Sequence, residues 1–531
     1  MQNRVIKKAI LLYAMTLCLG YIGAQTHVVI DNPATWSASS LKGYSGDIIF
    51  DVPLYVCGYS SEGLIVSPRR NYVPTNQEFP RTSGYNDFSK VNVSGNMILT
   101  DYSGYEAPIR TGMRIHNLRA SYSGGTTIRF TSGEWRGNSR TDLMNMDIHA
   151  AVGKTEANKD SMLIICGMNV ENYDARTSST DNKRMKARKA LAKINADIYG
   201  LAELRPGEEA IKEITDYLKN NLHKEYTFIG DGSTYSSTGQ KVGFIFDKNK
   251  VSLVGVVQET NVGVTGRKKM IAFRDNRTDE IFIYSINHFK AKVSTGATGI
   301  NMDQGDGQGA YNPDRVNEAR AIMSTYSYER SQVSDPDILI MGDLNAYAKE
   351  DPLTFLHKSG MIDLHRQFHA DSSYSYTTRG GSQFGYLDHA LCSKSLLPQV
   401  TGMLAYHINS DERDSYSGDN SIFRCSDHDP IVVGLKLNSS AATPTLSVSN
   451  IVNSDNVSVD GNLITIHNAK LTNLPAFYKI YDTNGTKIQE GEILTNSHSI
   501  SMPRTPGVYF LWVMHNNSDK GAVSRHKIIV Y

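Results

Sequence analysis

The segment from Asp337 to Tyr347, DILIMGDLNAY, constrains the fold of this chain more than any other. The apolar run Ile338–Met341 is typical of a strand that is buried on both faces. Asp343 and Asn345 follow it, and residues two apart on an extended chain point to the same face. A turn that ends the strand would use the same two residue types. The segment alone therefore leaves two interpretations open, a turn or a polar site at the end of the strand.

Other apolar runs along the chain also carry polar side chains at one end. Such runs end at Asn169, at Glu203 and at His288, and another begins directly after Asp427-His428. Strands of a mixed sheet can bring their ends to one edge, where loops build a site on a rigid scaffold. The recurrence favours a site over a series of turns.

Oxygen donors without cysteine suit a hard divalent cation, Mg²⁺ first, with Mn²⁺ or Ca²⁺ as alternatives. Two histidines beside such an ion suit acid–base chemistry on a phosphate ester. The sequence therefore predicts a site for metal-assisted phosphoester hydrolysis.

Six ordered motifs carry a resemblance to a known family: GMNVENYD at 167–174, LAEL at 201–204, INHFKAK at 286–292, GDLNAY at 342–347, YLDHALCS at 386–393 and CSDHDPIVVGL at 425–435. Together they resemble the endonuclease/exonuclease/phosphatase superfamily, and within it the secreted bacterial nucleases related in fold to pancreatic deoxyribonuclease. The resemblance covers residues 159–438 and implies an α/β class. The fold that it implies is two packed sheets flanked by helices, a four-layer α-β-β-α sandwich.

The resemblance also implies a role for each candidate residue. Those at the metal would be Asn169, Glu203 and Asp427. Asp343 would orient or deprotonate the attacking water, and Asn345 would brace the phosphate.

The remaining matched positions concern the phosphate and the protons. His428 would contact the scissile phosphate, Asp388 would hydrogen-bond that histidine, and His288 would be the general acid for the leaving oxygen. Arg267 stands where relatives carry an arginine that grips phosphate. Lys268 and Lys269 follow it in place of the expected proline-containing motif, which leaves its match loose.

The N-terminus reads as a secretory signal peptide, residues 1–24, with Arg4, Lys7 and Lys8 before a short apolar core. That core is shorter than the roughly 20 residues of a spanning helix, and no other stretch is apolar enough to span a bilayer. Removing the signal changes the formal net charge from +1 to −2. Strong affinity for nucleic acid by bulk charge is therefore not expected, and any groove for it must be local.

The four cysteines of the mature chain are Cys57, Cys166, Cys392 and Cys425, which are too few for a disulfide scaffold. A bridge between Cys392 and Cys425 requires the strands that carry Asp388 and His428 to pair with each other. Cys166 lies inside an apolar run and is expected to be a buried small hydrophobe.

Helical spacing of apolar residues occurs at 183–195, 208–221 and 313–328. Pro313 suits a first helical turn, with Asn312 before it as the N-cap. Helices that alternate with short apolar strands support the α/β class.

Residues 25–158 have few helical periods and many Gly, Ser, Thr and Tyr, which predicts a small all-β domain. The segments 64–80 and 112–130 are similar to the oligonucleotide-binding-fold-like (OB-like) module found ahead of bacterial extracellular nucleases. Candidates for contacting single strands are Arg69, Arg70, Tyr72 and Arg81. A packing module without a ligand is the alternative.

Residues 439–446 read as a linker, and residues 447–531 as a β-sandwich around an Asn-Gly turn. This last part resembles the C-terminal sorting domain of the type IX secretion system. The resemblance implies export through the periplasm and outer membrane to the cell surface or medium, with that machinery as a partner. An adhesive or carbohydrate-binding sandwich is the alternative.

The sequence thus leads to an exported, Mg²⁺-dependent endonuclease for DNA, with RNA left open, acting as a monomer. A phosphatase or a sphingomyelinase-like phosphodiesterase of the same fold is the nearer alternative. No exposed hydrophobic loop for entering a membrane is evident in the sequence, which disfavours the lipase. A non-catalytic surface protein that binds nucleic acid is the alternative of another class, disfavoured because no catalytic position is substituted.

Overall fold

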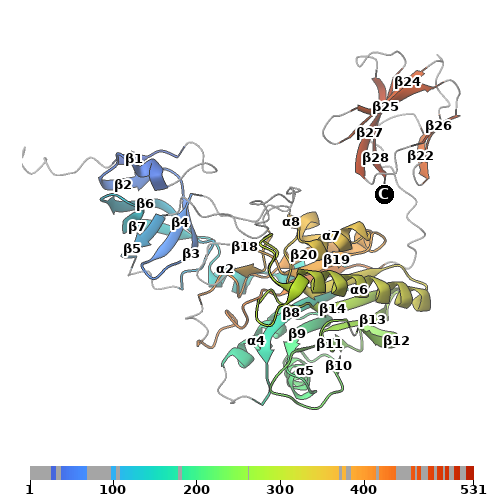
Figure 1. The fold of residues 1–531 in the computed structure, drawn as a ribbon, viewed down its shortest axis with the longest axis horizontal. Coiled ribbons are helices and arrows are strands. Elements are labelled where there is room, and N and C mark those ends of the chain that lie inside the picture. Colours follow the sequence, from blue (N-terminus) through green and yellow to red (C-terminus); the bar gives the residue numbers. More distant parts are fainter. Residues whose placement is uncertain are drawn as a thin grey trace, which may run out of the picture. The chain divides into compact units, whose positions relative to one another are not determined.

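The chain was analysed as a computed structural model, which divides into two compact units, Met1–Ser439 and Ser440–Tyr531 (Figure 1). The structure describes residues 26–30, 38–68, 97–102, 108–176, 182–260, 262–369, 373–377, 384–413, 418–437, 456–460, 463–467, 476–482, 487–493, 497–501, 507–514 and 522–530. The expected signal peptide, the linker, and the candidates Arg69, Arg70, Tyr72 and Arg81 lie outside these ranges.

The first unit begins with a seven-stranded sheet in the order β1-β2-β6-β3-β4-β5-β7. Its strands are β1 (Thr26–Val28), β2 (Gly46–Phe50), β3 (Leu54–Tyr59), β4 (Leu64–Ser67), β5 (Met97–Thr100), β6 (Arg114–Tyr122) and β7 (Thr127–Arg136). Because β6 also pairs with β7, the strands β3 to β7 close into a ring, in which only β5 and β7 run parallel. Alternate side chains of β6 are buried and point into this ring, where they join an apolar core that belongs to the first sheet.

A second sheet has six strands in the order β10-β11-β9-β8-β21-β20. They are β8 (Leu163–Tyr173), β9 (Ile198–Leu204), β10 (Tyr226–Ile229), β11 (Lys241–Asp247), β20 (Val400–Ala405) and β21 (Ile431–Leu435). Only β8 and β9 run parallel, and helix α4 (Asn182–Ile194) connects them. The polar ends of these two strands therefore meet at one edge of the sheet.

The third sheet also has six strands, in the order β12-β13-β14-β15-β19-β16. They are β12 (Val251–Glu259), β13 (Lys268–Asp275), β14 (Ile281–His288), β15 (Ile338–Asp343), β16 (Ile362–Asp363) and β19 (Asp388–Cys392). Only β14 and β15 run parallel, joined by helix α6 (Asn312–Val333).

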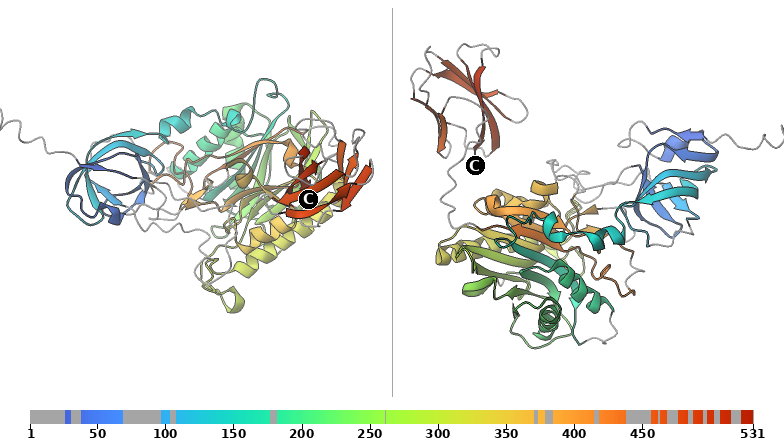
Figure 2. Two further views of the ribbon diagram at one scale, coloured as in Figure 1. Left: turned by 90° about the horizontal axis from the view of Figure 1, so that it is seen from above. Right: turned by 180° about the vertical axis from the view of Figure 1, so that it is seen from behind.

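The two six-stranded sheets share one apolar core, in which Phe244 of β11 lies 5.9 Å from Phe273 and 5.2 Å from Tyr284 between ring centroids. Helices α4 and α5 (Glu209–Leu222) bury their apolar residues against the sheet of β8 and β9. Helices α6 and α7 (Asp351–Lys358) pack on the sheet of β14 and β15 (Figure 2). The mixed α/β class is confirmed.

Two short helices, α2 (Arg140–Asn145) and α3 (Ile148–Ala151), lead from β7 to β8. Their buried residues Leu143 and Ile148 belong to the core under α4 and α5, and not to the core of the first sheet. Among the described helices, none is both long and apolar enough to cross a membrane.

The expected helices agree with α4, α5 and α6 to within one or two residues, apart from the longer C-terminal end of α6. The expected N-cap was wrong, because Tyr311 precedes the helix with a left-handed φ of 61°. Asn312 is already helical, and its Nδ2 donates to Asp351 Oδ2 at 2.9 Å.

The bridge between Cys392 and Cys425, which the sequence left open, is not formed, since both thiols are free and buried. The strand of Cys392, β19, pairs with β15 and β16 in one sheet, whereas His428 directly precedes β21 in the other. Cys166 is buried within β8, as expected.

The second unit consists of a three-stranded sheet, β22-β23-β26, and a four-stranded sheet, β25-β24-β27-β28. Its strands are β22 (Asn456–Asp460), β23 (Leu463–His467), β24 (Ala476–Asp482), β25 (Lys487–Ile493), β26 (Ser497–Ser501), β27 (Gly507–Met514) and β28 (Ala522–Val530). Ile464, Ile480, Ile500 and Leu511 come from both sheets and share one core, separate from those of the first unit.

Candidate active site

Three candidate residues form a row across the third sheet. His288 of β14 pairs in register with Asp343 of β15, which pairs in turn with Asp388 of β19. Asn169 lies within β8 and Glu203 is the last residue but one of β9 in the other sheet, and Asn169 Nδ2 donates to Asp343 Oδ2 at 3.2 Å. The candidates therefore meet where the ends of two sheets adjoin, and not at the edge of a single sheet.

Gly342 allows β15 to lie close to β14 just before Asp343. Its φ is 121°, and a Cβ at this position would lie 2.0 Å from the backbone oxygen of Asn287 on β14. Beyond it, Asn345 Nδ2 donates to Phe289 O at 3.1 Å and to Asp343 Oδ2 at 3.2 Å. Asn345 thus holds the carboxylate of Asp343 and ties it to the residue that follows β14.

The carboxylates of Glu203 and Asp343 lie around one amide. Asn169 Nδ2 donates to Glu203 Oε1 at 3.0 Å as well as to Asp343. His288 Nε2 lies 3.5 Å from Glu203 Oε1 and 3.7 Å from Asp343 Oδ2. One ligand atom from each of Glu203, His288 and Asp343 falls within 4.8 Å of the others, which makes a candidate metal site.

The donor chemistry of this cluster fits a divalent cation. Burial raises the pKa of Glu203, and it raises the pKa of Asp343 to about 7. In addition, His288 Nδ1 and Asp427 Oδ1 are buried with no hydrogen-bond partner among the described residues. A cation among these groups would favour the ionised carboxylates and offset their desolvation. Without a cation, the burial of such polar atoms with no partner would cost free energy.

His428 is held as a charged imidazole. Its Nδ1 lies 2.7 Å from Asp388 Oδ2, and its Nε2 lies 3.7 Å from Asp343 Oδ2. Burial lowers the pKa of His428, but the carboxylates of Asp388 and Asp343 outweigh it and raise the pKa well above its usual value. Ser375 Oγ donates to the same Asp388 oxygen at 2.7 Å, which fixes the dyad.

His288 has the opposite electrostatics. Burial, and then the charges of Arg267 and His428, lower its pKa well below the usual value. The two histidines therefore differ in charge at neutral pH, His428 being cationic and His288 neutral. Asp427, expected at the metal, lies beside His428, with Oδ1 3.9 Å from Nε2.

Arg267 lies at the same site despite its loose motif. Its positive charge interacts with the carboxylates of Glu203 and Asp343, while burial lowers the pKa of its guanidinium. Gln240 Oε1 accepts from its Nη2, and the backbone oxygen of Arg267 accepts from His288 N at 2.8 Å.

The two lysines after Arg267 have other partners. Lys268 forms a buried pair with Glu318 at 2.9 Å, and Lys269 Nζ donates to Gly230 O at 2.6 Å. Within this motif, Arg267 is thus the residue whose charge acts on Glu203 and Asp343.

Sequence reasoning assigned no role to three residues that hold the site. Ser426 Oγ donates to Asn169 O at 2.8 Å, Ser375 holds Asp388, and Gln240 holds Arg267. Ser426 stands inside the quoted CSDHD motif, so the motif could have indicated it. Ser375 and Gln240 stand in polar stretches with no pattern to single them out.

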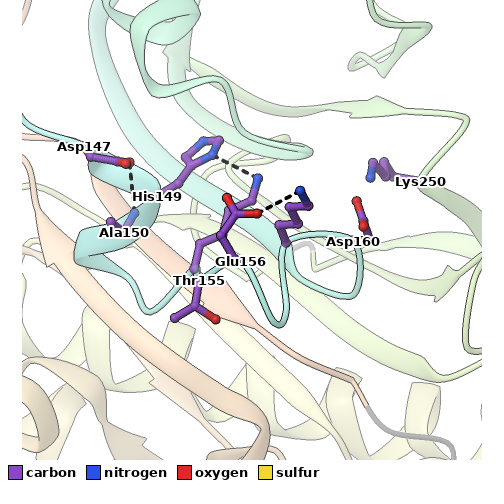
Figure 3. Close-up of a pocket in the computed structure, with 9 residues that line it drawn as sticks. Asp147, His149, Ala150, Thr155, Glu156, Asp160 and Lys250 are labelled. Atoms are coloured by element: carbon purple, nitrogen blue, oxygen red, sulfur yellow. Dashed lines mark hydrogen bonds and ion pairs between the residues drawn. The ribbon is translucent and has the colours of Figure 1, made fainter.

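A pocket of about 430 Å³ lies elsewhere, beside α3 (Figure 3). Lys154 Nζ lies 3.4 Å from His149 Nδ1 there, and Lys159 Nζ lies 2.9 Å from Glu156 Oε2. Basic and acidic side chains therefore pair within it, and none of its lining residues is a site candidate.

The fold and the site define a mixed α/β domain with carboxylates, amides and histidines gathered at the strand ends of two sheets. Residues 168–428 match the sequence model of the Endonuclease/Exonuclease/phosphatase family. This region of the chain belongs to that superfamily, whose members act on phosphoester bonds. No curated protein matches the chain.

Among solved structures, the human Nocturnin catalytic domain is 14% identical, with 52% of this chain and 94% of that chain covered and a TM-score of 0.38. A mannosyl-6-phosphatase from Bacteroides thetaiotaomicron is 16% identical, with coverages of 51% and 98% and a TM-score of 0.38. D. rerio TDP2 complexed with single strand DNA product is 16% identical, with coverages of 52% and 100% and a TM-score of 0.36.

Proposed function

We propose that this protein is an exported, metal-dependent phosphodiesterase that hydrolyses nucleic acid, an endonuclease for DNA, with RNA left open as a substrate. The position of Asp343 supports this proposal most. Its Oδ2 lies 3.7 Å from the Nε2 atoms of both His288 and His428, between the candidate metal ligands and the charged dyad. A phosphate and a water bound at this point would meet a base, cations and amide donors together.

Hydrolysis requires a water oxygen to bond to phosphorus while the bond to the leaving oxygen breaks in line. Asp343 would accept the proton of the water, and Asn345 and Arg267 would donate to the phosphate oxygens. The charged His428 would stabilise the negative charge that accumulates on them. A divalent cation such as Mg²⁺, held by Glu203, Asp343 and the neighbouring His288 or Asn169, would neutralise further phosphate charge.

The leaving oxygen needs a proton, and His288 is the candidate donor. Burial opposes its protonated form, so this role requires the negative charge of a bound phosphate to raise its pKa. Without that shift the neutral imidazole serves the metal instead, as its place beside Glu203 and Asp343 allows.

The test is plasmid nicking by the purified protein. Supercoiled plasmid should be nicked with Mg²⁺ and protected by EDTA. Plasmid that stays intact with Mg²⁺, Mn²⁺ and Ca²⁺ would contradict the endonuclease. Single-stranded DNA, RNA, a phosphomonoester and sphingomyelin, assayed beside it, would separate the nuclease from the phosphatase and the lipase of the same fold.

The sphingomyelinase-like alternative keeps one observation in its favour. The segment between β14 and α6 exposes Val293, Ile300 and Met302 by 59%, 75% and 56%. The sequence had suggested no such apolar loop. Exposed apolar side chains in the segment that follows His288 suit a lipid surface, so sphingomyelin belongs in the panel. The non-catalytic alternative is disfavoured by the gathering of Glu203, His288, Asp343 and His428, which a surface that only bound nucleic acid would not require.

Export rests on the sequence: the signal at 1–24 and the sorting-domain resemblance at 447–531. We expect the protein in the culture medium or at the cell surface, as a monomer, with the type IX machinery as its export partner. Mass spectrometry of the exported protein should find an N-terminus at Gln25 and the sorting domain removed. A cell-associated chain that retains residues 1–24 would contradict this route.

A further inference from the structure

The loop that leads from β20 toward β21, residues 406–412, is anchored by the first sheet. Asp411 is fully buried, and its carboxylate accepts from Thr111 Oγ1 and from Asn138 Nδ2, the latter at 2.7 Å. The backbone oxygen of Asp411 accepts from Thr111 N at 3.1 Å and from Tyr59 OH at 3.2 Å. Tyr59 ends β3 and Thr111 precedes β6, so two segments of the first sheet hold this loop.

Charged groups strengthen the same contact. Glu412 is buried, forms an ion pair with Arg110, and accepts from Arg140, whose Nη2 lies 2.7 Å from Glu412 Oε2. Burying two adjacent carboxylates is costly unless each is paired and hydrogen-bonded. Removing one donor to either carboxylate should therefore change the conformation of the loop, because a buried charge would be left without its partner.

The other side of the loop holds the catalytic segment. Asn409 Nδ2 donates to the backbone oxygen of His428 at 2.6 Å. The carboxylate of Asp429 accepts from the backbone nitrogens of Asn409 and Ser410 at 2.8 and 3.0 Å, and from His407 Nδ1 at 2.9 Å. The loop therefore holds both the backbone oxygen of His428 and Asp429, the residue that follows it.

A second route runs from Asp411 to the partner of His428. Tyr374 OH donates to Asp411 Oδ2 at 2.7 Å, and its ring stacks on His407 with centroids 3.7 Å apart. The next residue, Ser375, donates to Asp388, which holds His428 Nδ1. Both members of the Asp388–His428 dyad are thus connected to Asp411 by short hydrogen-bonded paths.

We infer that Thr111 and Asp411 are positioning residues for His428, so that the N-terminal sheet is part of the scaffold of the active site. The inference rests on the proposed hydrolysis. It differs from a binding role for this sheet, because a module that only bound nucleic acid would leave the hydrolysis of a small diester unaffected. A catalytic group displaced by its support loses turnover on any substrate.

The variant Thr111→Val removes one hydroxyl and keeps the shape of the side chain. With bis(p-nitrophenyl) phosphate and Mg²⁺ we expect kcat to fall about tenfold, on the scale of a lost buried hydrogen bond, with KM unchanged. Thr111→Ser should restore kcat. The matched control is Thr215→Val on α5, which removes a hydroxyl bonded to Ile211 O and should retain kcat. Equal kcat in Thr111→Val and in the wild type would overturn the inference.

A second pair of variants tests the hydrogen bond from Tyr374 to Asp411. Tyr374→Phe removes the hydroxyl and keeps the stacked ring, and it should lower kcat by a similar factor. Its control, Tyr122→Phe, removes a hydroxyl bonded to Gly125 O within the first sheet and should not. Loss of activity in both tyrosine variants would point to general instability and contradict the assignment.

Hydrogen exchange separates this inference from the proposed function. A peptide that spans residues 425–429 should exchange faster in Thr111→Val than in Thr215→Val, whatever the substrate. A wild-type protein inactive on every phosphoester would refute the proposed function alone. Unchanged exchange in that peptide would refute the connection itself.

Discussion

At the scale of single residues, Asp343 is where the charges of the site meet. Its carboxylate accepts from Asn169 and Asn345 and faces both histidines. Burial raises its pKa from 3.8 to about 7, so the folded protein binds this proton more tightly than the unfolded chain does. The stability that this proton contributes is fully present below about pH 4 and is lost as the pH rises through 7.

The variant Asp343→Asn should therefore gain stability while losing activity. In EDTA at pH 8 the ionised carboxylate destabilises the wild type, and the neutral amide removes that cost. We expect a rise in Tm of at least about 2 °C, the effect of 1 kcal/mol in a domain of this size. At pH 4 the difference should vanish. Plasmid nicking should fall a hundredfold or more with the base removed. A lower Tm in the variant at pH 8 would contradict the buried-charge argument.

The variant Asp388→Asn tests the charge of His428. Asp388 raises the pKa of this histidine, so its removal should leave the imidazole neutral at a lower pH. The basic limb of kcat/KM against pH should then move to lower pH, with a loss of about a hundredfold at neutral pH. The control is Ser375→Ala, which removes one donor to Asp388 and keeps the charge. A basic limb that stayed in place in Asp388→Asn would refute the dyad.

At the scale of elements, the sequence predicted the strands that carry the candidate polar residues but not which sheet each strand joins. The apolar runs before Asn169, Glu203 and Asp343 are strands, as expected. Their division between two sheets depends on pairing partners far along the chain, which local patterns do not encode. The same limit explains why the sequence left the bridge between Cys392 and Cys425 open, since it depended on a pairing between strands that belong to different sheets.

Gly342 tests how closely β15 must approach β14. Gly342→Ala would place a Cβ 2.0 Å from Asn287 O at a φ of 121°, so the two strands would have to separate just before Asp343. We expect a loss of about 3 kcal/mol or more in urea unfolding, and loss of activity. The control is Gly232→Ala, whose φ is 65° with nothing within 4 Å of the added Cβ, and which should cost about 1 kcal/mol. Equal costs would show that backbone strain alone acts at Gly342.

At the scale of the whole molecule, the contacts that join the parts of the first unit were invisible in the sequence. Thr111 and Asp411 are 300 residues apart, and neither stands in a motif. The sequence did indicate an all-β N-terminal region and a strand-rich C-terminal one, because alternation within a strand is local. The hydrogen bonds that place one region against another have no such period, so only the fold reveals them.

The two compact units should respond separately to heat and to metal. Only the first contains a cluster of metal-competent ligands among the described residues, and the second has its own core around Leu511. Calorimetry should therefore show two transitions, and Mg²⁺ should raise only the one that belongs to the first unit, since a ligand stabilises the domain that binds it. Leu511→Ala should lower only the other transition, at a cost of about 2–5 kcal/mol, and leave plasmid nicking unchanged. One shared transition that both changes moved would mean that the units unfold together, and the site could then not be treated as a property of the first unit alone.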